Sequence, residues 1–224
     1  MEFPEEKQLY DIEDQFMLGE ALLVKPVSSP NVQELQVTLP ATAIWYSYHS
    51  LALQTPGPDG ELSVTITAES IPIYVRGGSI IAKKERVRRS SAMMKDDPHT
   101  IYVFPDRVDG VAEGRLYIDD GTSYEYLDGQ FIDVTFTLTD GAFTWQHAQK
   151  APEGLVLWVD RIIVIGQDLP SAVSFTPSLA KPSVALAFDR ENGAAAAVVV
   201  RTVGVDFMAD GRITFQYNLE KDDL

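Results

Sequence analysis

The chain has 224 residues, 45% hydrophobic and 23% charged, which is an ordinary composition for a globular protein of one large or two modest domains. Its formal net charge of −15 excludes nucleic acid and anionic membrane surfaces as expected partners, and no run approaches the roughly 18 apolar residues that span a bilayer. Zero cysteines exclude disulfides and thiolate metal sites, which fits either a cytosolic chain or one from an oxidising compartment.

The first ten residues lack the basic and apolar segments of a secretory leader, because polar residues such as Glu2 and Glu5 interrupt any hydrophobic run. We therefore expect residue 1 to continue from an upstream portion of a longer polypeptide. Residues 10–20 carry a weakly helical pattern. After them come short runs rich in Val, Ile, Tyr and Phe, which predict strands at 21–27, 35–39, 44–48, 62–68, 73–75, 100–104, 114–118, 132–138, 142–146, 155–165, 171–175, 184–188, 195–200 and 212–217.

So many short strands favour an all-β fold of packed sandwiches over a parallel sheet with crossover helices. Turn dipeptides agree with this prediction at Asp120-Gly121, Asp128-Gly129, Asp140-Gly141, Asn192-Gly193 and Asp210-Gly211. The composition changes at 83–98, where a basic run gives way to Asp96-Asp97-Pro98. This change places a domain boundary there, with a smaller sandwich before it and a larger one after it.

Metal and nucleophile motifs are missing from the sequence. His49, His99 and His147 lie far apart without the spacing of a zinc site, so each is interpreted as a surface or loop histidine. No Gly-x-Ser-x-Gly elbow is present, and no glycine-rich loop opens a helix. Gly77-Gly78 precedes a strand-like segment, so it is interpreted as a backbone turn.

Adjacent acidic pairs are candidates for catalytic carboxylates, because glycosidases use two. Neighbours on a strand point to opposite faces, so an adjacent pair there cannot flank one bond. Asp119-Asp120-Gly121 is interpreted as a hairpin turn after the strand that ends at residue 118. Asp160, in a Trp-Val-Asp sequence that resembles a nucleophile strand, is interpreted as a solvent-facing strand residue. No catalytic, metal-binding or cofactor-binding residue is therefore assigned, no cofactor is expected, and substrate-binding residues are unknown.

The densest aromatic group is Trp45-Tyr46-Ser47-Tyr48. Strand alternation places Trp45 and Ser47 on one face and Tyr46 and Tyr48 on the other. Core packing accounts for one face. The other face is open to three interpretations: exposure to solvent, burial against a neighbouring domain, or a platform for sugar rings.

Several motifs together resemble, in order and spacing, the C-terminal third of glycoside hydrolase family 31. They are Asp-Gln-Phe-Met-Leu-Gly at 14–19, Leu-Leu-Val-Lys-Pro-Val at 22–27, Leu-Pro at 39–40, Trp-Tyr at 45–46 and Ile-Pro-Ile-Tyr-Val-Arg-Gly-Gly-Ser-Ile-Ile at 71–81. Three further segments, 86–91, 94–98 and 116–121, are similar to the α subunits of endoplasmic-reticulum glucosidase II within that family. The resemblance extends from about residue 3 to at least residue 166.

The resemblance implies a domain organisation that the strands alone do not. Residues 1–20 would be the exit of the last strand of a missing catalytic (β/α)8 barrel, 21–88 a proximal antiparallel β-sandwich and 89–224 a distal one. The catalytic aspartates would lie on the upstream barrel, outside this chain. The implied partners are that barrel portion, a glucosidase II β subunit and an N-glycan substrate, and the implied location is the lumen of the endoplasmic reticulum.

Two functions from different classes follow. The first is a non-catalytic C-terminal portion of a retaining exo-α-glucosidase that trims α-1,3-linked glucose from N-linked glycans in glycoprotein quality control. The alternative is a stand-alone carbohydrate-binding or adaptor β-sandwich protein. The last four residues, 221–224, differ by one conservative acid from a Lys-Asp-Glu-Leu retrieval signal, and an ordinary acidic tail is the equal alternative.

Overall fold

The structure is a computed structural model that describes residues 2–67, 71–106, 110–177, 183–190 and 197–217. Within these ranges almost all regular structure is β, which confirms the all-β expectation. The strands are β1 (Phe16–Leu18), β2 (Leu22–Val24), β3 (Glu34–Thr38), β4 (Trp45–Ser47), β5 (Glu61–Thr65), β6 (Ile73–Arg76), β7 (Ser79–Lys83), β8 (His99–Phe104), β9 (Ala112–Ile118), β10 (Ile132–Thr139), β11 (Ala142–His147), β12 (Val159–Ile165), β13 (Ala172–Pro177), β14 (Val184–Ala185), β15 (Phe188–Arg190), β16 (Ala197–Arg201) and β17 (Gly211–Gln216). Three short 3₁₀ helices accompany them among the described residues: η1 (Lys7–Leu9), η2 (Ser91–Met94) and η3 (Glu125–Asp128).

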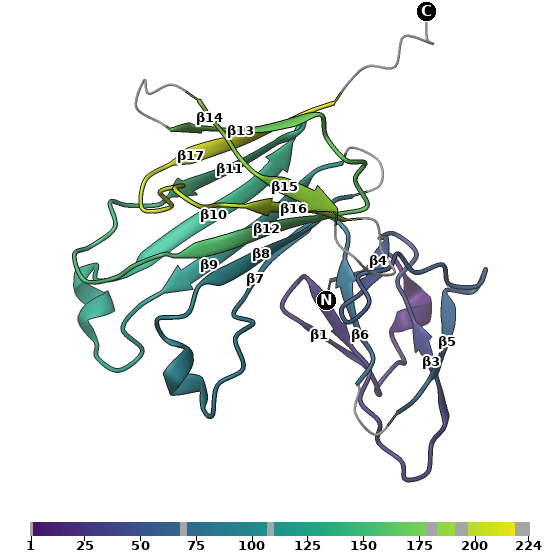
Figure 1. The fold of residues 1–224 in the computed structure, drawn as a ribbon. Coiled ribbons are helices and arrows are strands. Elements are labelled where there is room, and N and C mark those ends of the chain that lie inside the picture. The colour runs from purple at the N-terminus through teal and green to yellow at the C-terminus, as the bar shows by residue number, and fades with distance from the viewer. Residues whose placement is uncertain (1, 68–70, 107–109, 178–182, 191–196, 218–224) are drawn as a thin grey trace, which may run out of the picture.

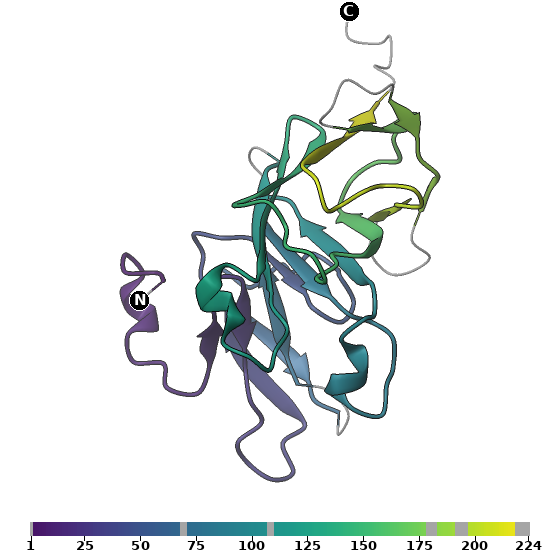
Figure 2. The same ribbon diagram turned by 90° about the vertical axis from the view of Figure 1, so that its left-hand side faces the viewer.

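The strands form three sheets. The two smaller ones have the orders β1-β2-β6-β4 and β3-β5, and the large one has the order β14-β13-β17-β11-β10-β9-β7-β8-β12-β16-β15. In Figure 1 the large sheet occupies the upper left and the two small sheets the lower right. Figure 2, turned by 90°, shows the green and yellow strands of the large sheet curving over its teal strands.

This curvature lets the large sheet enclose one core. Apolar residues from β10, β11, β13 and β17 share a buried cluster with residues from β8, β12 and β16. The two arms of one continuous sheet therefore face each other as two layers. Trp145 marks the middle of this core, because its ring stacks on Phe175 at 5.8 Å and on Phe207 at 4.4 Å.

Strands β8, β12 and β16 are buried on both faces, which explains their nearly continuous apolar sequences. One face contributes Ile101, Val103, Ile162, Val164, Val198 and Val200 to the main core. The other face contributes Tyr102, Phe104, Ile163, Ile165, Ala197 and Val199 to a second core, together with Tyr46 and Val75 of the first small sheet. The second core joins the small and large sheets.

A third core lies between the two small sheets. It contains Phe3, Leu23, Val37, Leu39, Trp45 and Tyr74. The N-terminal segment thus enters the interior through Phe3 before the first strand begins. The described chain stacks as four layers around three cores, from β3-β5 at one end to β9-β10-β11 at the other.

Some sequence-based expectations are wrong. Residues 10–20 contain no helix, because Phe16–Leu18 pairs with Leu22–Val24 around a turn where Gly19 has a φ of +62°. Pairing is not wholly antiparallel either, since β8 and β12 run parallel, as doubly buried strands joined by a long connection can. A separate feature of the topology is that β7, at the end of the range 21–88, pairs with β8 and β9 and so joins the large sheet.

Of two hairpin turns predicted from the sequence, one is confirmed and one is wrong. Asp140-Gly141 forms the expected two-residue hairpin, with positive φ at both residues. Asp119-Asp120-Gly121 does not, because it opens a longer connection, 119–131, that contains η3. Asn192-Gly193 and the tail 221–224 lie outside the described residues. Among the helices that are described, none has the length and apolar character needed to cross a membrane.

Candidate functional site

The N-terminal segment presents large apolar side chains to solvent. Tyr10, Phe16 and Leu18 are 50%, 52% and 60% exposed. Two of them belong to β1, which forms one edge of its sheet and so leaves one row of backbone groups without a strand partner. We call the surface formed by Tyr10, Phe16 and Leu18 the N-terminal surface.

A buried carboxylate fixes this segment to the small sheets. Glu6 is only 6% exposed. Its Oε1 accepts hydrogen bonds from the Thr42 N–H and hydroxyl at 2.9 and 2.6 Å, and its Oε2 accepts from the Ala41 N–H at 3.0 Å. Burial raises the pKa of Glu6, but the bonds from Thr42 and Ala41 outweigh it, so the net pKa lies below its ordinary value. The carboxylate is therefore ionised and structural at neutral pH.

Further contacts hold the rest of the segment. The Gln15 side chain pairs with the Thr38 backbone like a strand residue, donating to its carbonyl at 2.7 Å and accepting from its N–H at 3.1 Å. Asp14 lies 2.6 Å from the Nζ of Lys25, whose side chain is buried. The exposed apolar side chains are thus displayed on a segment anchored at several points.

Two hollows adjoin the N-terminal surface. One, of about 220 Å³, is mainly apolar and lies between Phe3, Leu9, Ile12 and Phe16. The other is a groove of about 650 Å³ between the β1–β2 turn, the β6–β7 turn and β9. Together with the exposed apolar side chains, these hollows give a surface suited to docking another folded portion.

Glycines at the back of the groove allow neighbouring strands to lie close together within each sheet. A Cβ on Gly77 would lie 2.3 Å from Cγ1 of Ile44, and one on Gly114 would lie 2.2 Å from the carbonyl oxygen of Ile80. Real Cβ atoms do not approach so closely. Gly77-Gly78 is therefore a packing turn, as expected from the sequence, and Gly78 has a φ of +86°.

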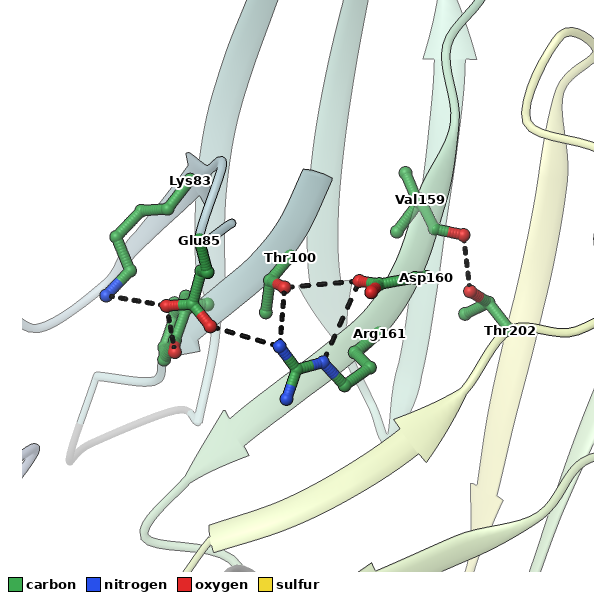
Figure 3. Close-up of polar contacts among 8 residues, drawn as sticks. Lys83, Glu85, Thr100, Val159, Asp160, Arg161 and Thr202 are labelled. Carbon is green, nitrogen blue, oxygen red and sulfur yellow. Dashed lines mark hydrogen bonds and ion pairs between the residues drawn. The ribbon is translucent and has the colours of Figure 1, made fainter. Parts of the chain in front are cut away.

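A polar network lies where the small and large sheets meet (Figure 3). Glu85 accepts a hydrogen bond from the Tyr102 hydroxyl at 2.6 Å and one from Arg161 at 3.1 Å, and Lys83 lies 3.5 Å away. Arg161 also reaches Thr100, which donates to Asp160 at 3.2 Å. Every charged group in this network has a partner of opposite sign, which is typical of ion pairs that stabilise a fold.

Lys83 connects the two sides of this junction. Its Nζ lies 3.7 Å from the ring centroid of Tyr102 and 4.6 Å from that of Tyr48, which follows β4 of the small sheet. Burial lowers the pKa of Lys83, and Glu85 opposes this effect. Burial, and then the charge of Glu85, raises the pKa of Tyr48. The network fixes the small sheet against the large one.

The aromatic group weighed as a sugar platform is buried. Trp45 and Tyr46 are 2% and 6% exposed. The Trp45 indole donates to the Pro40 carbonyl at 2.9 Å within the third core, and the Tyr46 hydroxyl donates to the Pro105 carbonyl at 2.9 Å. Of the three interpretations left open by the sequence, burial against the neighbouring sheet holds for Tyr46, and the sugar platform is wrong here.

The three histidines lie in separate parts of the fold, and neither they nor the acidic pairs within the described ranges form a common site. His49 contacts the Ile71 carbonyl, His147 contacts the Phe207 carbonyl, and His99 is buried at the start of β8. The residues that the structure describes contain no group of three or more His, Cys, Asp or Glu placed to hold a metal ion. Asp160 is half-buried in the junction network and does not face solvent freely.

Sequence reasoning missed Glu6 and Gln15 as structural residues. Each acts across more than 20 residues of chain, and no spacing motif marks such a contact. Glu6 lies between Glu5 and Lys7, so nothing in the local sequence distinguishes it from an exposed acid.

Comparison with known proteins places these features in a family. A family profile described as the C-terminal domain of glycosyl hydrolase family 31 matches residues 1–81. Human neutral alpha-glucosidase AB is 34% identical over 218 residues, covering 95% of this chain and 22% of that protein. Glucosidase 2 subunit alpha of Saccharomyces cerevisiae is 38% identical over 139 residues, covering 61% and 14%.

Solved structures agree. A crystal structure of glucosidase II alpha subunit bound to alpha3-Glc2 matches with a TM-score of 0.80 and 32% identity over 91% of this chain and 24% of that one. A heterodimeric complex of the ER glucosidase II catalytic subunit with the binding domain of its regulatory subunit matches with a TM-score of 0.80 and 32% identity, over 91% and 23%. The matched part of the chain thus spans between 14% and 24% of these relatives. It belongs to glycosyl hydrolase family 31 and corresponds to the C-terminal part of the α-glucosidases of that family.

Proposed function

We propose that this chain is the non-catalytic C-terminal portion of a retaining exo-α-glucosidase of the glucosidase II type. The observation that carries the proposal is the N-terminal surface: exposed apolar side chains on an anchored segment, in a chain that covers only 22% of a relative's length. Such a surface is expected where a folded portion has been separated from its neighbour. The catalytic carboxylates belong to that neighbour.

The domain assignment follows from the same proposal. Residues 1–20 are the exit from the last strand of a (β/α)8 barrel, 21–88 form a proximal sandwich and 89–224 a distal one, with β7 of the range 21–88 also pairing into the large sheet. The occupant of the N-terminal surface is then the upstream barrel portion of the same polypeptide. Tyr10, Phe16 and Leu18 offer it exposed apolar side chains, and Phe16 also lines the hollow of about 220 Å³.

The substrate and location are inferred from the relatives. One solved relative is bound to alpha3-Glc2, and another is described as an ER glucosidase II complex with its regulatory subunit. We infer that the parent enzyme trims α-1,3-linked glucose from N-glycans in the lumen of the endoplasmic reticulum. Its further partner is a β subunit.

The proposal is tested by binding between this chain and the polypeptide encoded upstream of residue 1. Co-expression should give one complex that survives gel filtration. Leu18→Glu places a charge on the N-terminal surface and should weaken the association about tenfold or more, since charges are disfavoured at the centre of an apolar interface. Leu18 is 60% exposed, so the variant should fold normally.

Val87→Glu is the matched control. Val87 is 98% exposed and lies on the β7–β8 connection, away from the N-terminal surface. It should associate like the unmodified chain. Failure of the unmodified chain to associate, or equal effects of the two substitutions, would overturn the proposed docking and favour the alternative of a stand-alone carbohydrate-binding or adaptor protein.

A further inference from the structure

Four aromatic rings gather on the connection between β9 and β10. Tyr117 stacks on Phe131 at 5.3 Å, and Tyr124 lies 6.2 Å from Tyr126. Tyr117 and Tyr124 are 46% and 76% exposed. Both pairs belong to the end of β9 and the connection that follows it, residues 119–131. We call these four residues the aromatic platform.

Several hydrogen bonds hold the loop under the platform in one shape. Asp120 accepts from the N–H groups of Thr122 and Ser123 at 3.1 and 3.0 Å. The Gln149 amide donates to the carbonyls of Gly129 at 2.8 Å and Phe131 at 3.2 Å. The exposed rings are therefore held in place before any ligand arrives, which reduces the entropy lost on binding.

Two of the carboxylates near the rings, Asp119 and Asp133, already accept hydrogen bonds from the protein. Asp133 accepts two hydrogen bonds from Arg115, at 2.6 and 2.5 Å, and Asp119 accepts from the Gly121 N–H at 2.8 Å. Because these carboxylates build the loop and its ion pair, they are poorly suited to capture a cation. What the platform offers to solvent is aromatic ring surface together with the tyrosine hydroxyls.

We propose that the aromatic platform is a binding site for neutral carbohydrate, with Tyr124 and Tyr117 stacking on pyranose rings. A pyranose has an apolar face of C–H bonds that packs on an aromatic ring, and its hydroxyls hydrogen-bond with polar groups around the ring. That the sugar contains glucose rests on the proposed function. The platform would hold part of a glucose-bearing glycan on the large sheet.

The test uses the intact 224-residue chain and the α-1,3-linked disaccharide of glucose. Saturation-transfer NMR should show the sugar bound, with tyrosine side chains as the source. Tyr124→Ala should weaken binding of the disaccharide about three- to tenfold, because it removes the contribution of one aromatic contact to the binding free energy. Tyr124→Phe keeps the ring and should bind the disaccharide as the unmodified chain does. Tyr217→Ala, which removes a tyrosine 41% exposed elsewhere, is the matched control and should leave binding unchanged.

Three results would overturn the platform: no transfer to the disaccharide, equal binding by Tyr124→Ala and the unmodified chain, or equal losses in Tyr124→Ala and Tyr217→Ala. An arginine-rich peptide that binds at these rings in place of the sugar, with affinity falling as salt rises, would also overturn it. Association with the upstream portion is scored separately. If the chain associates with the upstream portion but binds no sugar, only the carbohydrate site is contradicted. If it binds sugar through Tyr124 but does not associate with the upstream portion, only the proposed docking is contradicted.

Discussion

Replacing Glu6 with Gln tests whether one carboxylate anchors the N-terminal surface. Two donors converge on each oxygen: the Thr42 N–H and hydroxyl on Oε1, and the Ala41 N–H and Gln8 amide on Oε2. A glutamine keeps the shape but turns one oxygen into a donor. In either orientation of the amide, one buried backbone N–H then faces another donor.

The expected loss of stability comes from the buried backbone N–H that lacks an acceptor. A buried donor left without an acceptor costs about 1–3 kcal/mol, whereas the Thr42 hydroxyl can rotate to another acceptor. We therefore expect Glu6→Gln to lower the free energy of unfolding at pH 7 by about 1–3 kcal/mol in urea denaturation. Hydrogen exchange at the amides of Ala41 and Thr42 should accelerate.

Glu5→Gln is the matched control, because Glu5 is exposed and adjacent in sequence. It should change the free energy of unfolding by less than about 0.5 kcal/mol. Equal stabilities of Glu6→Gln and Glu5→Gln, with unchanged exchange at Ala41 and Thr42, would refute the reasoning.

The effect also has a defined pH dependence. The folded pKa of Glu6 lies below the unfolded value of about 4.3, so the stabilisation is fully present above that pH and is lost as pH falls through the folded pKa. The difference between the unmodified chain and Glu6→Gln should therefore shrink below about pH 4. A difference that stays constant down to pH 2 would contradict this assignment.

Three further predictions concern the large sheet and its junction. Gly114→Ala drives a Cβ against the Ile80 carbonyl and should lower the free energy of unfolding by about 1–3 kcal/mol or more, whereas the exposed Glu113→Ala should not; equal melting temperatures would contradict this. Glu85→Gln should lower the pKa of Tyr48 in an ultraviolet titration, and an unchanged pKa would remove Glu85 as a cause of its shift. Burial and then Lys84 lower the pKa of His99, so stability should fall as pH drops below about 6.5, and His99→Gln should flatten this slope in urea denaturation; an unchanged slope would contradict it.

The strands were predictable because their signals are local. Alternating residues such as those of 114–118 have one face in the core, and Asp140-Gly141 is a hairpin signal that needs no distant partner. The apolar run at 195–200 likewise indicated a buried strand, and β16 is covered on both faces. The family resemblance, based on ordered motifs, also held.

What escaped prediction depends on contacts between distant residues. Residues 10–20 looked helical in isolation, yet β1 forms because β2 offers it a partner. The parallel pairing of β8 with β12 is set by a long intervening chain segment that no local pattern describes. The aromatic platform was missed because Tyr117 and Phe131 are 14 positions apart and meet only through the register of β9 and β10.

The most direct test of the central claim is hydrolysis of an aryl α-glucoside by this chain and its upstream portion, assayed apart and after co-expression. We expect no hydrolysis by this chain alone and sustained hydrolysis by the copurified complex, because the proposed function places the catalytic carboxylates upstream and makes this chain part of their scaffold. Hydrolysis by this chain alone, or full activity of the upstream portion without it, would contradict the account.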